Sequence, residues 1–156
     1  MVVQMNTIEA QFWIGVHGVI IDEGGRILVL RRAPALLYRP GHWDLPGGHL
    51  ALDEDIHDCL HREIAEETGL AVELGPLLGL NQAKDGPYVQ MIFECRPKSV
   101  GELRLQLQEH DAAQWLTVAQ MRQLPRLIPY LSAILRRGML DRIRFQADQA
   151  LNLKRT

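Results

Sequence analysis

What the chain has little of already narrows its function. It contains two cysteines among 156 residues, Cys59 and Cys95, and they form no CxxC pair. A disulfide scaffold and a cysteine-based zinc site are therefore poorly supported, and a reducing cytoplasm is the expected location. No apolar run approaches the roughly 20 residues that cross a bilayer. The first ten residues lack the basic and apolar segments of a secretory signal, so we expect neither export nor a membrane anchor.

The chain also lacks a large charge of either sign. Seventeen lysines and arginines stand against 19 aspartates and glutamates, for a net charge of −2. A general nucleic-acid or membrane-surface binder would carry a strong basic excess, so neither is expected. Apolar residues make up 47% and charged residues 23%, which is ordinary for a globular protein and argues against disorder. The length predicts a single domain over residues 1–156.

Segments with strand character and segments with helix character alternate along the chain. Glycine, proline and capping residues at their ends set the expected boundaries. We expect strands at 12–21, 26–32, 70–80, 88–96 and ending at Trp115–Leu116, and helices at 54–68, 117–124 and 129–137. The strand at 26–32 is expected to return after a turn at 22–25, and a loop rich in proline and glycine follows at 33–48. This order predicts an α/β or α+β fold with a mixed sheet, and the tail at 139–156 is ambiguous between helix and strand.

The helix expected at 54–68 carries an unusual face. On a wheel of 100° per residue, Ile56 and Leu60 lie close to Glu63, Glu66 and Glu67. The face that is apolar in the early turns thus becomes three carboxylates in the last turn. These carboxylates are expected to point inward or along the rim of the core. The alternative, a solvated acidic helix end, is weakened because the same face is apolar.

The grouping of these carboxylates carries two costs. Like charges at i, i+3 and i+4 repel, and the dipole at the C-terminal end of a helix disfavours anions. A compensating cation is therefore expected, and hard oxygen ligands favour Mg²⁺ or Mn²⁺. Gly47 and Gly48, just ahead of the helix, let the backbone approach a metal or a phosphate without a Cβ in the way.

A competing candidate for a metal site is the pair His57 and His61, which have the i, i+4 spacing of metal ligands on a helix. The residue after His57 is Asp58, so the pair does not match the HExxH pattern. Both histidines also lie away from the carboxylate face. We expect them to be exposed helix residues.

Residues 48–70 resemble the Nudix box. The family pattern is Gly, five residues, Glu, seven residues, then Arg-Glu-U-x-Glu-Glu-x-Gly-U, where U is a bulky aliphatic residue. Every defined position is filled, by Gly48, Glu54, Arg62, Glu63, Ile64, Glu66, Glu67, Gly69 and Leu70. The segments on either side of the box also resemble the family, so the resemblance spans about residues 12–137. Ala51 and Asp53 stand where many members have Glu and Gly, which puts the number of bound metals in doubt.

The resemblance implies a Nudix α/β/α sandwich with a mixed sheet and the box as a loop-helix-loop. It also implies metal-dependent hydrolysis of a nucleoside diphosphate linked to a further group X, with Mg²⁺ or Mn²⁺ as cofactor. The metal ligands that it implies are Glu63, Glu66, Glu67 and the carbonyl of Gly47, with Glu54 as a ligand or a structural partner. Arg62 would orient a box carboxylate. Dimerisation is common in the family, but no stripe of residues here identifies an interface.

The general base is left open by the resemblance, because family members place it in the box or on a later loop. Glu109 is the candidate on a later loop, since it lies six residues before Trp115. The alternative is a solvated loop charge beside His110 and Asp111. Arg32, at a strand end, is a candidate for the substrate phosphates because its planar fork suits phosphate oxygens. A merely exposed arginine is the alternative.

The identity of X is also open. Tyr38, Trp43 and Tyr88 are candidates to stack on a base and Asn81 or Gln90 to contact its edge, although packing is the commoner role of such residues. The context of Arg31, Arg32, Trp43 and Asp44 favours a (deoxy)nucleoside triphosphate, cleaved to a monophosphate and pyrophosphate. ADP-ribose, nucleotide sugars and dinucleoside polyphosphates are alternatives, because Pro87 and Tyr88 give conflicting signals about the substrate.

Two other functions are alternatives to such an enzyme. A non-catalytic, nucleotide-sensing domain would predict loss of box carboxylates, and none is missing. An RNA-processing enzyme would need a basic channel.

Overall fold

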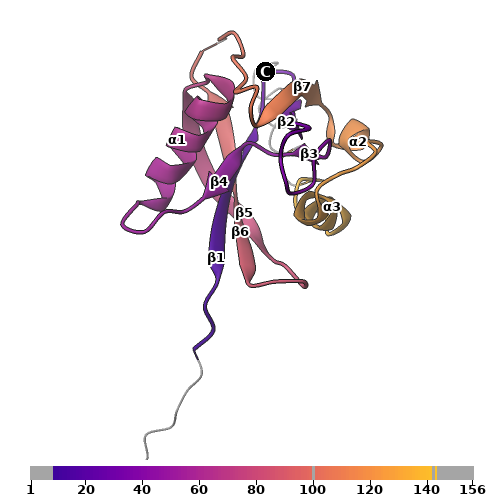
Figure 1. Ribbon diagram of the computed structural model, residues 1–156. Coiled ribbons are helices and arrows are strands. Elements are labelled where there is room, and N and C mark those ends of the chain that lie inside the picture. Colours follow the sequence, from indigo (N-terminus) through magenta and orange to yellow (C-terminus); the bar gives the residue numbers. More distant parts are fainter. Residues whose placement is uncertain (1–8, 100, 142, 144–156) are drawn as a thin grey trace, which may run out of the picture.

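The computed structural model describes residues 9–99, 101–141 and 143 (Figure 1). The elements in chain order are β1 (Trp13–Ile20), β2 (Ile27–Arg32), β3 (Trp43–Asp44), β4 (Gly47–His49), α1 (Ile56–Thr68), β5 (Val72–Gln82), β6 (Tyr88–Pro97), β7 (His110–Leu116), α2 (Val118–Met121) and α3 (Pro129–Arg136). No helix among the described residues is both long and apolar enough to cross a membrane.

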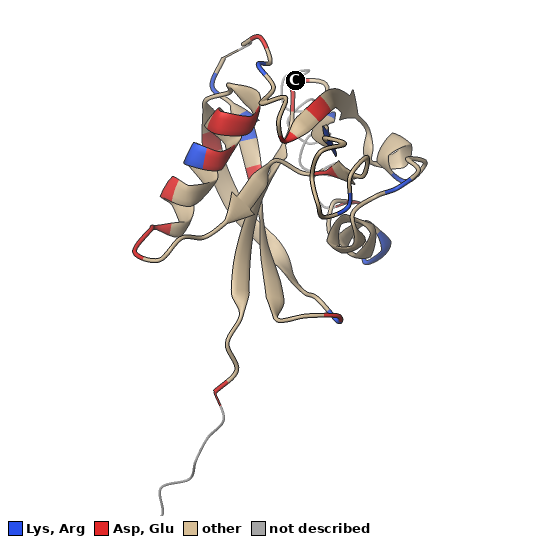
Figure 2. Cartoon of the chain, viewed as in Figure 1, with Lys and Arg blue, Asp and Glu red and all other residues tan. Residues whose placement is uncertain are grey.

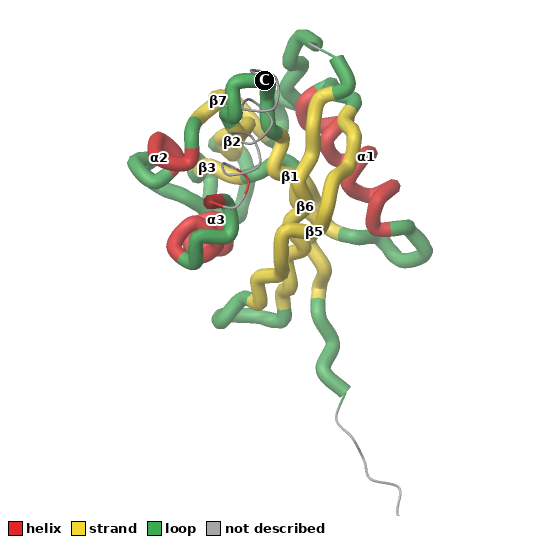
Figure 3. The backbone as a smooth tube through the Cα atoms, turned by 180° about the vertical axis from the view of Figure 1, so that it is seen from behind, coloured by secondary structure: helices red, strands yellow, loops and turns green. Residues whose placement is uncertain are grey.

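The strands form two sheets. The first has the order β4-β1-β6-β5, in which β1 and β6 run parallel and the other pairs antiparallel. The second is antiparallel, with the order β3-β2-β7. Helix α1 lies on one side of the strands and α2 and α3 lie on the other (Figures 1 and 3). The expected α/β/α fold with a mixed sheet is confirmed.

The second strand does not return beside the first. A turn forms at 22–25, where the Asp22 carboxylate accepts hydrogen bonds from the backbone N–H groups of Gly24 and Arg26. Beyond a single bridge between Ile21 and Ile27, however, β2 pairs with β3 and β7 in the other sheet. The physical reason is burial, because the first four residues of β2 are all buried. A strand that is apolar on both faces is stabilised by layers on both sides.

Two apolar clusters hold the layers together. The cluster on the side of α1 packs Leu60 and Ile64 against Val16 and Ile20 of β1, and all four are fully buried. The other cluster lies under α2 and α3 and is built from Val19, Ile21, Ile27, Val29, Trp43, Leu45, Ile92, Val118, Met121, Ile128, Tyr130, Leu131, Ile134, Leu135, Leu140 and Ile143. The two clusters fix α1 and α3 on opposite sides of the strand layers.

The ends of α1 determine where its carboxylates lie. Asp55 caps the N-terminus by accepting from the N–H groups of His57 and Asp58, so the helix begins at Ile56 and Glu54 lies just outside it. At the other end Gly69 adopts a left-handed conformation, as the sequence predicts. Helix α2 ends at Met121, earlier than Leu124. Of the ambiguous tail, residues 142 and 144–156 lie outside the described part of the chain.

Candidate active site

The glycine pair of β4 brings the backbone directly against α1. A Cβ added to Gly48 would collide with the carboxyl group of Glu63, and one added to Gly47 would collide with the carbonyl oxygen of Val16. Gly47 also has a φ of 151°, which L side chains rarely adopt. Both positions therefore require glycine, and the result is a strand backbone in contact with the acidic end of the helix.

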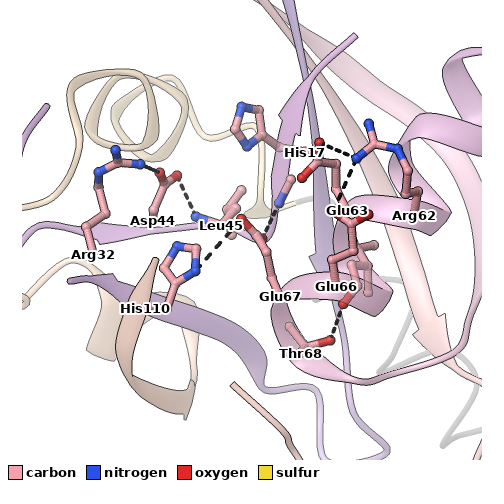
Figure 4. A network of polar contacts seen from close by, with 12 residues as sticks. His17, Arg32, Asp44, Leu45, Arg62, Glu63, Glu66, Glu67, Thr68 and His110 are labelled. Carbon is pink, nitrogen blue, oxygen red and sulfur yellow. Dashed lines mark hydrogen bonds and ion pairs between the residues drawn. The ribbon is translucent and has the colours of Figure 1, made fainter. Parts of the chain in front are cut away.

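Arg62 is surrounded by three carboxylates. Its Nε lies 2.7 Å from Oε1 of Glu54. Its Nη1 lies 2.9 Å from Oε1 of Glu63 and 3.3 Å from Oε2 of Glu66, two residues that Figure 4 shows beside it. The hydrogen bond from Arg62 lowers the pKa of Glu54 to about 2. Part of the positive charge that the acidic helix end requires is thus supplied by the protein itself. Arg62 contacts carboxylates, in the arrangement expected of an orienting residue.

Glu67 has no such partner. It occupies the last turn of α1 with its side chain buried, and its Oε2 accepts a hydrogen bond of 2.9 Å from the backbone N–H of Gly47. Burial raises the pKa of Glu67 to about 9. Neither Glu67 nor Glu109 forms an ion pair with a lysine or arginine in the described part of the chain. A buried carboxylate that has no positively charged partner is typical of a site that binds a cation.

Two residues at the start of β7 face Glu67. A carboxylate oxygen of Glu109, a ring nitrogen of His110 and a carboxylate oxygen of Glu67 all lie within 4.8 Å of one another. The Nδ1 of His110 is 3.8 Å from Oε1 of Glu67 (Figure 4). Burial lowers the pKa of His110 to about 4, so its ring is neutral near pH 7. The structure thus brings Glu109 beside Glu67 of the box. His110 was not predicted as a site residue, because the sequence shows it only as a neighbour of Glu109.

A second polar network lies next to this cluster, and sequence reasoning missed it. Asp44 is buried and accepts from Tyr130 Oη and from the N–H of Leu45, at 2.8 Å for the latter. Its other oxygen lies 3.3 Å from Nη1 of Arg32. Tyr130 Oη also lies 3.0 Å from Nδ1 of His17 in β1, which matches a donor on His17 and an acceptor on tyrosine. The network ties α3 to the chain that leads into Gly47.

The residues expected to bind substrate lie in different surroundings. Arg32 pairs with Asp44 and donates from Nε to the carbonyl of Tyr38. Trp43 is 7% exposed and packs within the core, and its contact with a base stays a prediction. Tyr88 is 41% exposed, and its ring lies 6.2 Å from that of His49, which directly follows Gly48.

The remaining candidates are placed as follows. Asn81 donates to Oε1 of the Gln90 side chain across β5 and β6. Tyr38 is exposed, with the guanidinium groups of Arg32 and Arg39 5.6 and 5.8 Å from its ring centroid. His57 and His61 are exposed, as expected.

The donor set fits a divalent cation. Figure 2 shows acidic residues along α1 and at the start of β7. Carboxylate oxygens are the ligands that Mg²⁺ and Mn²⁺ prefer, and Gly48 brings the backbone of β4 against the carboxyl group of Glu63. The buried and unpaired Glu67 supports the same assignment, because bound positive charge would offset the cost of its ionisation.

Comparisons with known proteins agree with this geometry. The family model described as NUDIX domain matches residues 11–137. A MutT-like protein of Streptomyces ambofaciens is 38% identical over 104 residues, which are 67% of this chain and 63% of that protein. The CTP pyrophosphohydrolase of Escherichia coli (strain K12) is 31% identical over 126 residues, which are 78% of this chain and 91% of that protein.

A solved structure is similar as well. The crystal structure of the MutT protein from Methanosarcina mazei Go1 matches with a TM-score of 0.73 and 27% identity, over 87% of this chain and 97% of that one. Some curated relatives are longer, since the match spans 63% of the Streptomyces protein and 38% of Nudix hydrolase 2 of Arabidopsis thaliana. The complete box, the fold and the match over residues 11–137 together show that this chain belongs to the Nudix family.

Proposed function

We propose that the protein is a metal-dependent pyrophosphohydrolase that cleaves a nucleoside diphosphate linked to a group X. The observation that carries this proposal is Glu67, a buried carboxylate that is held by the N–H of Gly47 and has no cation partner among the described residues. Glu63 and Glu66 lie on the same helix, and Glu109 lies across from them. A site with this much negative charge supports binding of a divalent cation and, through it, of a diphosphate.

Each residue then has a defined task. Glu63, Glu66, Glu67 and the carbonyl of Gly47 hold the cation, which when bound neutralises phosphate charge and lowers the pKa of a water molecule. Arg62 keeps Glu63 and Glu66 in position, because its guanidinium contacts both. Glu54 contacts Arg62 from outside the helix, and this favours a structural role over direct ligation.

Glu109 is the proposed general base. It lies beside Glu67 and, in the described part of the chain, carries no ion pair that would hold its carboxylate elsewhere. In the reaction, the oxygen of a water molecule bonds to phosphorus while the bond from that phosphorus to the bridging oxygen breaks. The proton of the water passes to the carboxylate. When X is a terminal phosphate, the bond that breaks is one of the two to the oxygen bridging the α- and β-phosphorus, and the products are a monophosphate and pyrophosphate. Glu66 and Glu67 are the alternatives within the box.

The proposed substrate is a (deoxy)nucleoside triphosphate. This choice is supported by the similarity to the CTP pyrophosphohydrolase, of which the match covers 91%. Tyr88 is proposed to contact the base, because its ring is partly exposed beside His49. Arg32 is proposed to face the phosphates, although this requires it to share its charge with Asp44.

The test is hydrolysis of a substrate panel by the purified protein with Mg²⁺ or Mn²⁺. The panel holds the ribo- and deoxynucleoside triphosphates, ADP-ribose, nucleotide sugars, dinucleoside polyphosphates and capped RNA. Phosphate is measured with either inorganic pyrophosphatase or a phosphomonoesterase added. Glu67→Gln should lower the rate by about 10²–10⁴-fold. Glu73→Gln, which changes an exposed glutamate on β5, should leave the rate unchanged.

The outcomes separate the alternatives. Phosphate that appears from a triphosphate only with pyrophosphatase shows release of a monophosphate and pyrophosphate. A signal from ADP-ribose or a nucleotide sugar that needs the phosphomonoesterase assigns X to that class instead. Nucleotide binding without hydrolysis under any condition contradicts the enzymatic proposal and favours a sensor. Full activity of Glu67→Gln contradicts the assigned metal site.

A further inference from the structure

The side chain of His110 contains a buried atom without a partner. This residue is 3% exposed at the start of β7, and its Nδ1 has no hydrogen bond with any described residue. A buried polar atom left unpaired costs about 1–3 kcal/mol. Folded proteins pair nearly all such atoms, so each exception needs an explanation. The Nδ1 of His110 is therefore expected to meet a ligand that is not part of the chain.

The direction of this nitrogen is informative. It points at Oε1 of Glu67 across 3.8 Å, which is too far for a hydrogen bond (Figure 4). Two ligand atoms that share a cation, each about 2.0–2.2 Å from it, lie roughly 3–4 Å apart. A carboxylate oxygen of Glu109 completes a group of three within 4.8 Å. The gap between His110 and Glu67 therefore has the width that a shared metal ion requires.

The charges around His110 also indicate a bound cation. Glu67 and Glu109 bring two carboxylates together, and no lysine or arginine of the described chain pairs with either one. Their neighbours Glu63 and Glu66 are paired with Arg62. The cluster of Glu67, Glu109 and His110 is thus the part of the site whose negative charge the protein does not balance.

We propose that Nδ1 of His110 is a metal ligand, and that with Glu67 and Glu109 it makes a mixed nitrogen and oxygen site selective for borderline divalent ions such as Zn²⁺ or Co²⁺ over Mg²⁺. Oxygen ligands alone suit Mg²⁺ and Mn²⁺, whereas an imidazole ligand suits Zn²⁺ and the later transition metals. The inference rests on the proposed function, because Glu67 serves both and Glu109 binds the metal through one oxygen, which leaves its other oxygen to accept the proton of water. It adds a ligand that the box does not contain and a preference that an all-oxygen site does not have.

The experiment compares metal binding by the metal-free protein, His110→Gln and His61→Gln. Calorimetric titration with Zn²⁺ and with Mg²⁺ should show wild-type affinity at least about tenfold higher for Zn²⁺. His110→Gln should weaken Zn²⁺ binding by at least about tenfold and leave Mg²⁺ binding nearly unchanged. His61→Gln, which changes an exposed histidine on α1, should behave as wild type. In the wild type, Zn²⁺ should shift the ¹⁵N resonance of His110 Nδ1.

Two results would overturn the inference alone. One is a folded His110→Gln protein with unchanged Zn²⁺ affinity, and the other is a His110 Nδ1 resonance that does not move with Zn²⁺, as expected if a water fills the gap. In either case the proposed function stands as long as Glu67→Gln lowers the rate of hydrolysis as expected. A wild-type protein that binds no divalent cation and hydrolyses nothing contradicts both. If His110→Gln does not fold, the wild-type resonance decides.

Discussion

The carboxylates around the C-terminal end of α1 fall into two halves, which differ in how their negative charge is balanced. In the paired half, Glu54, Glu63 and Glu66 share the guanidinium of Arg62. In the unpaired half, Glu67 is buried, with Glu109 and His110 close by and no cation partner in the described chain. The negative charge of the paired half is therefore partly balanced by the protein itself, and that of the unpaired half is not balanced by any described residue.

This difference shows which carboxylates have no positively charged partner among the described residues until a ligand binds. Arginine holds its charge at every accessible pH and fixes carboxylates through several hydrogen bonds. The paired half is thereby held in place before any ligand arrives. The unpaired half keeps the cost of burial, and a bound cation can offset that cost. We expect the two halves to respond differently to pH, to metal and to substitution.

The largest expected difference is the response of the metal-free protein to pH. Burial raises the pKa of Glu67 to about 9 from its ordinary 4.5. Between these values the folded chain binds more protons than the unfolded chain, so the free energy of unfolding falls as pH rises toward 9. From pH 7 to 9, where His110 no longer titrates, the slope is at most about 1.4 kcal/mol per pH unit.

Urea unfolding in EDTA at pH 7, 8 and 9 tests this prediction. The unfolding free energy of wild type minus that of Glu67→Gln should fall as pH rises, because glutamine does not titrate and the contributions of other groups cancel. Added Mg²⁺ should flatten the slope, since a bound cation keeps the carboxylate ionised. A difference that does not change with pH would show that Glu67 is already ionised in the metal-free protein.

The paired half gives the next largest effect. In Arg62→Met three carboxylates lose their shared cation, and the free energy of unfolding in EDTA should fall by about 1–3 kcal/mol, toward the lower end because Arg62 is partly exposed. Mg²⁺ should restore part of this loss, because the variant has more unpaired negative charge than the wild type. Chemical unfolding with and without Mg²⁺ measures both quantities.

Arg26→Met is the matched control. Arg26 pairs with a single carboxylate, Asp22, in an exposed turn. Its loss should change stability by no more than about 0.5–1 kcal/mol and should not depend on Mg²⁺. If Mg²⁺ stabilises wild type and Arg62→Met equally, Arg62 does not substitute for a cation and the distinction between the halves fails.

The paired half was largely predictable from the sequence, because it is local. Glu54, Arg62, Glu63 and Glu66 lie within 13 positions, and helical spacing places them together once Asp55 caps the helix. The capping residue, the left-handed Gly69 and the apolar stripe are all written in that one segment. The positive charge that the sequence predicts at the helix end is supplied in part by Arg62, and a bound metal ion there stays a prediction.

The unpaired half could be predicted only in part, because it depends on contacts between distant segments. His110 faces Glu67 because β2 and β7 pair in a second sheet, whereas β2 was expected to return beside β1. Periodicity shows that a strand is buried, but it does not show which strand is its neighbour. Trp43 illustrates the same limit, since an aromatic residue near the box packs into the core.

The smallest expected effect concerns the network that supports the unpaired half from α3. Tyr130 is fully within the core, and burial keeps its pKa well above the ordinary value, so its hydroxyl remains a donor to Asp44. Tyr130→Phe leaves His17 Nδ1 without its partner and removes one of the hydrogen bonds to Asp44. The free energy of unfolding should fall by about 1–2 kcal/mol.

Tyr38→Phe, a change at an exposed residue, is the control and should have no measurable effect on the free energy of unfolding. Equal stability of the two variants in urea would mean that Asp44 is held by Arg32 and Leu45 alone. A loss confined to Tyr130→Phe would show that α3 helps to fix the chain leading into Gly47, on which the geometry around Glu67 depends.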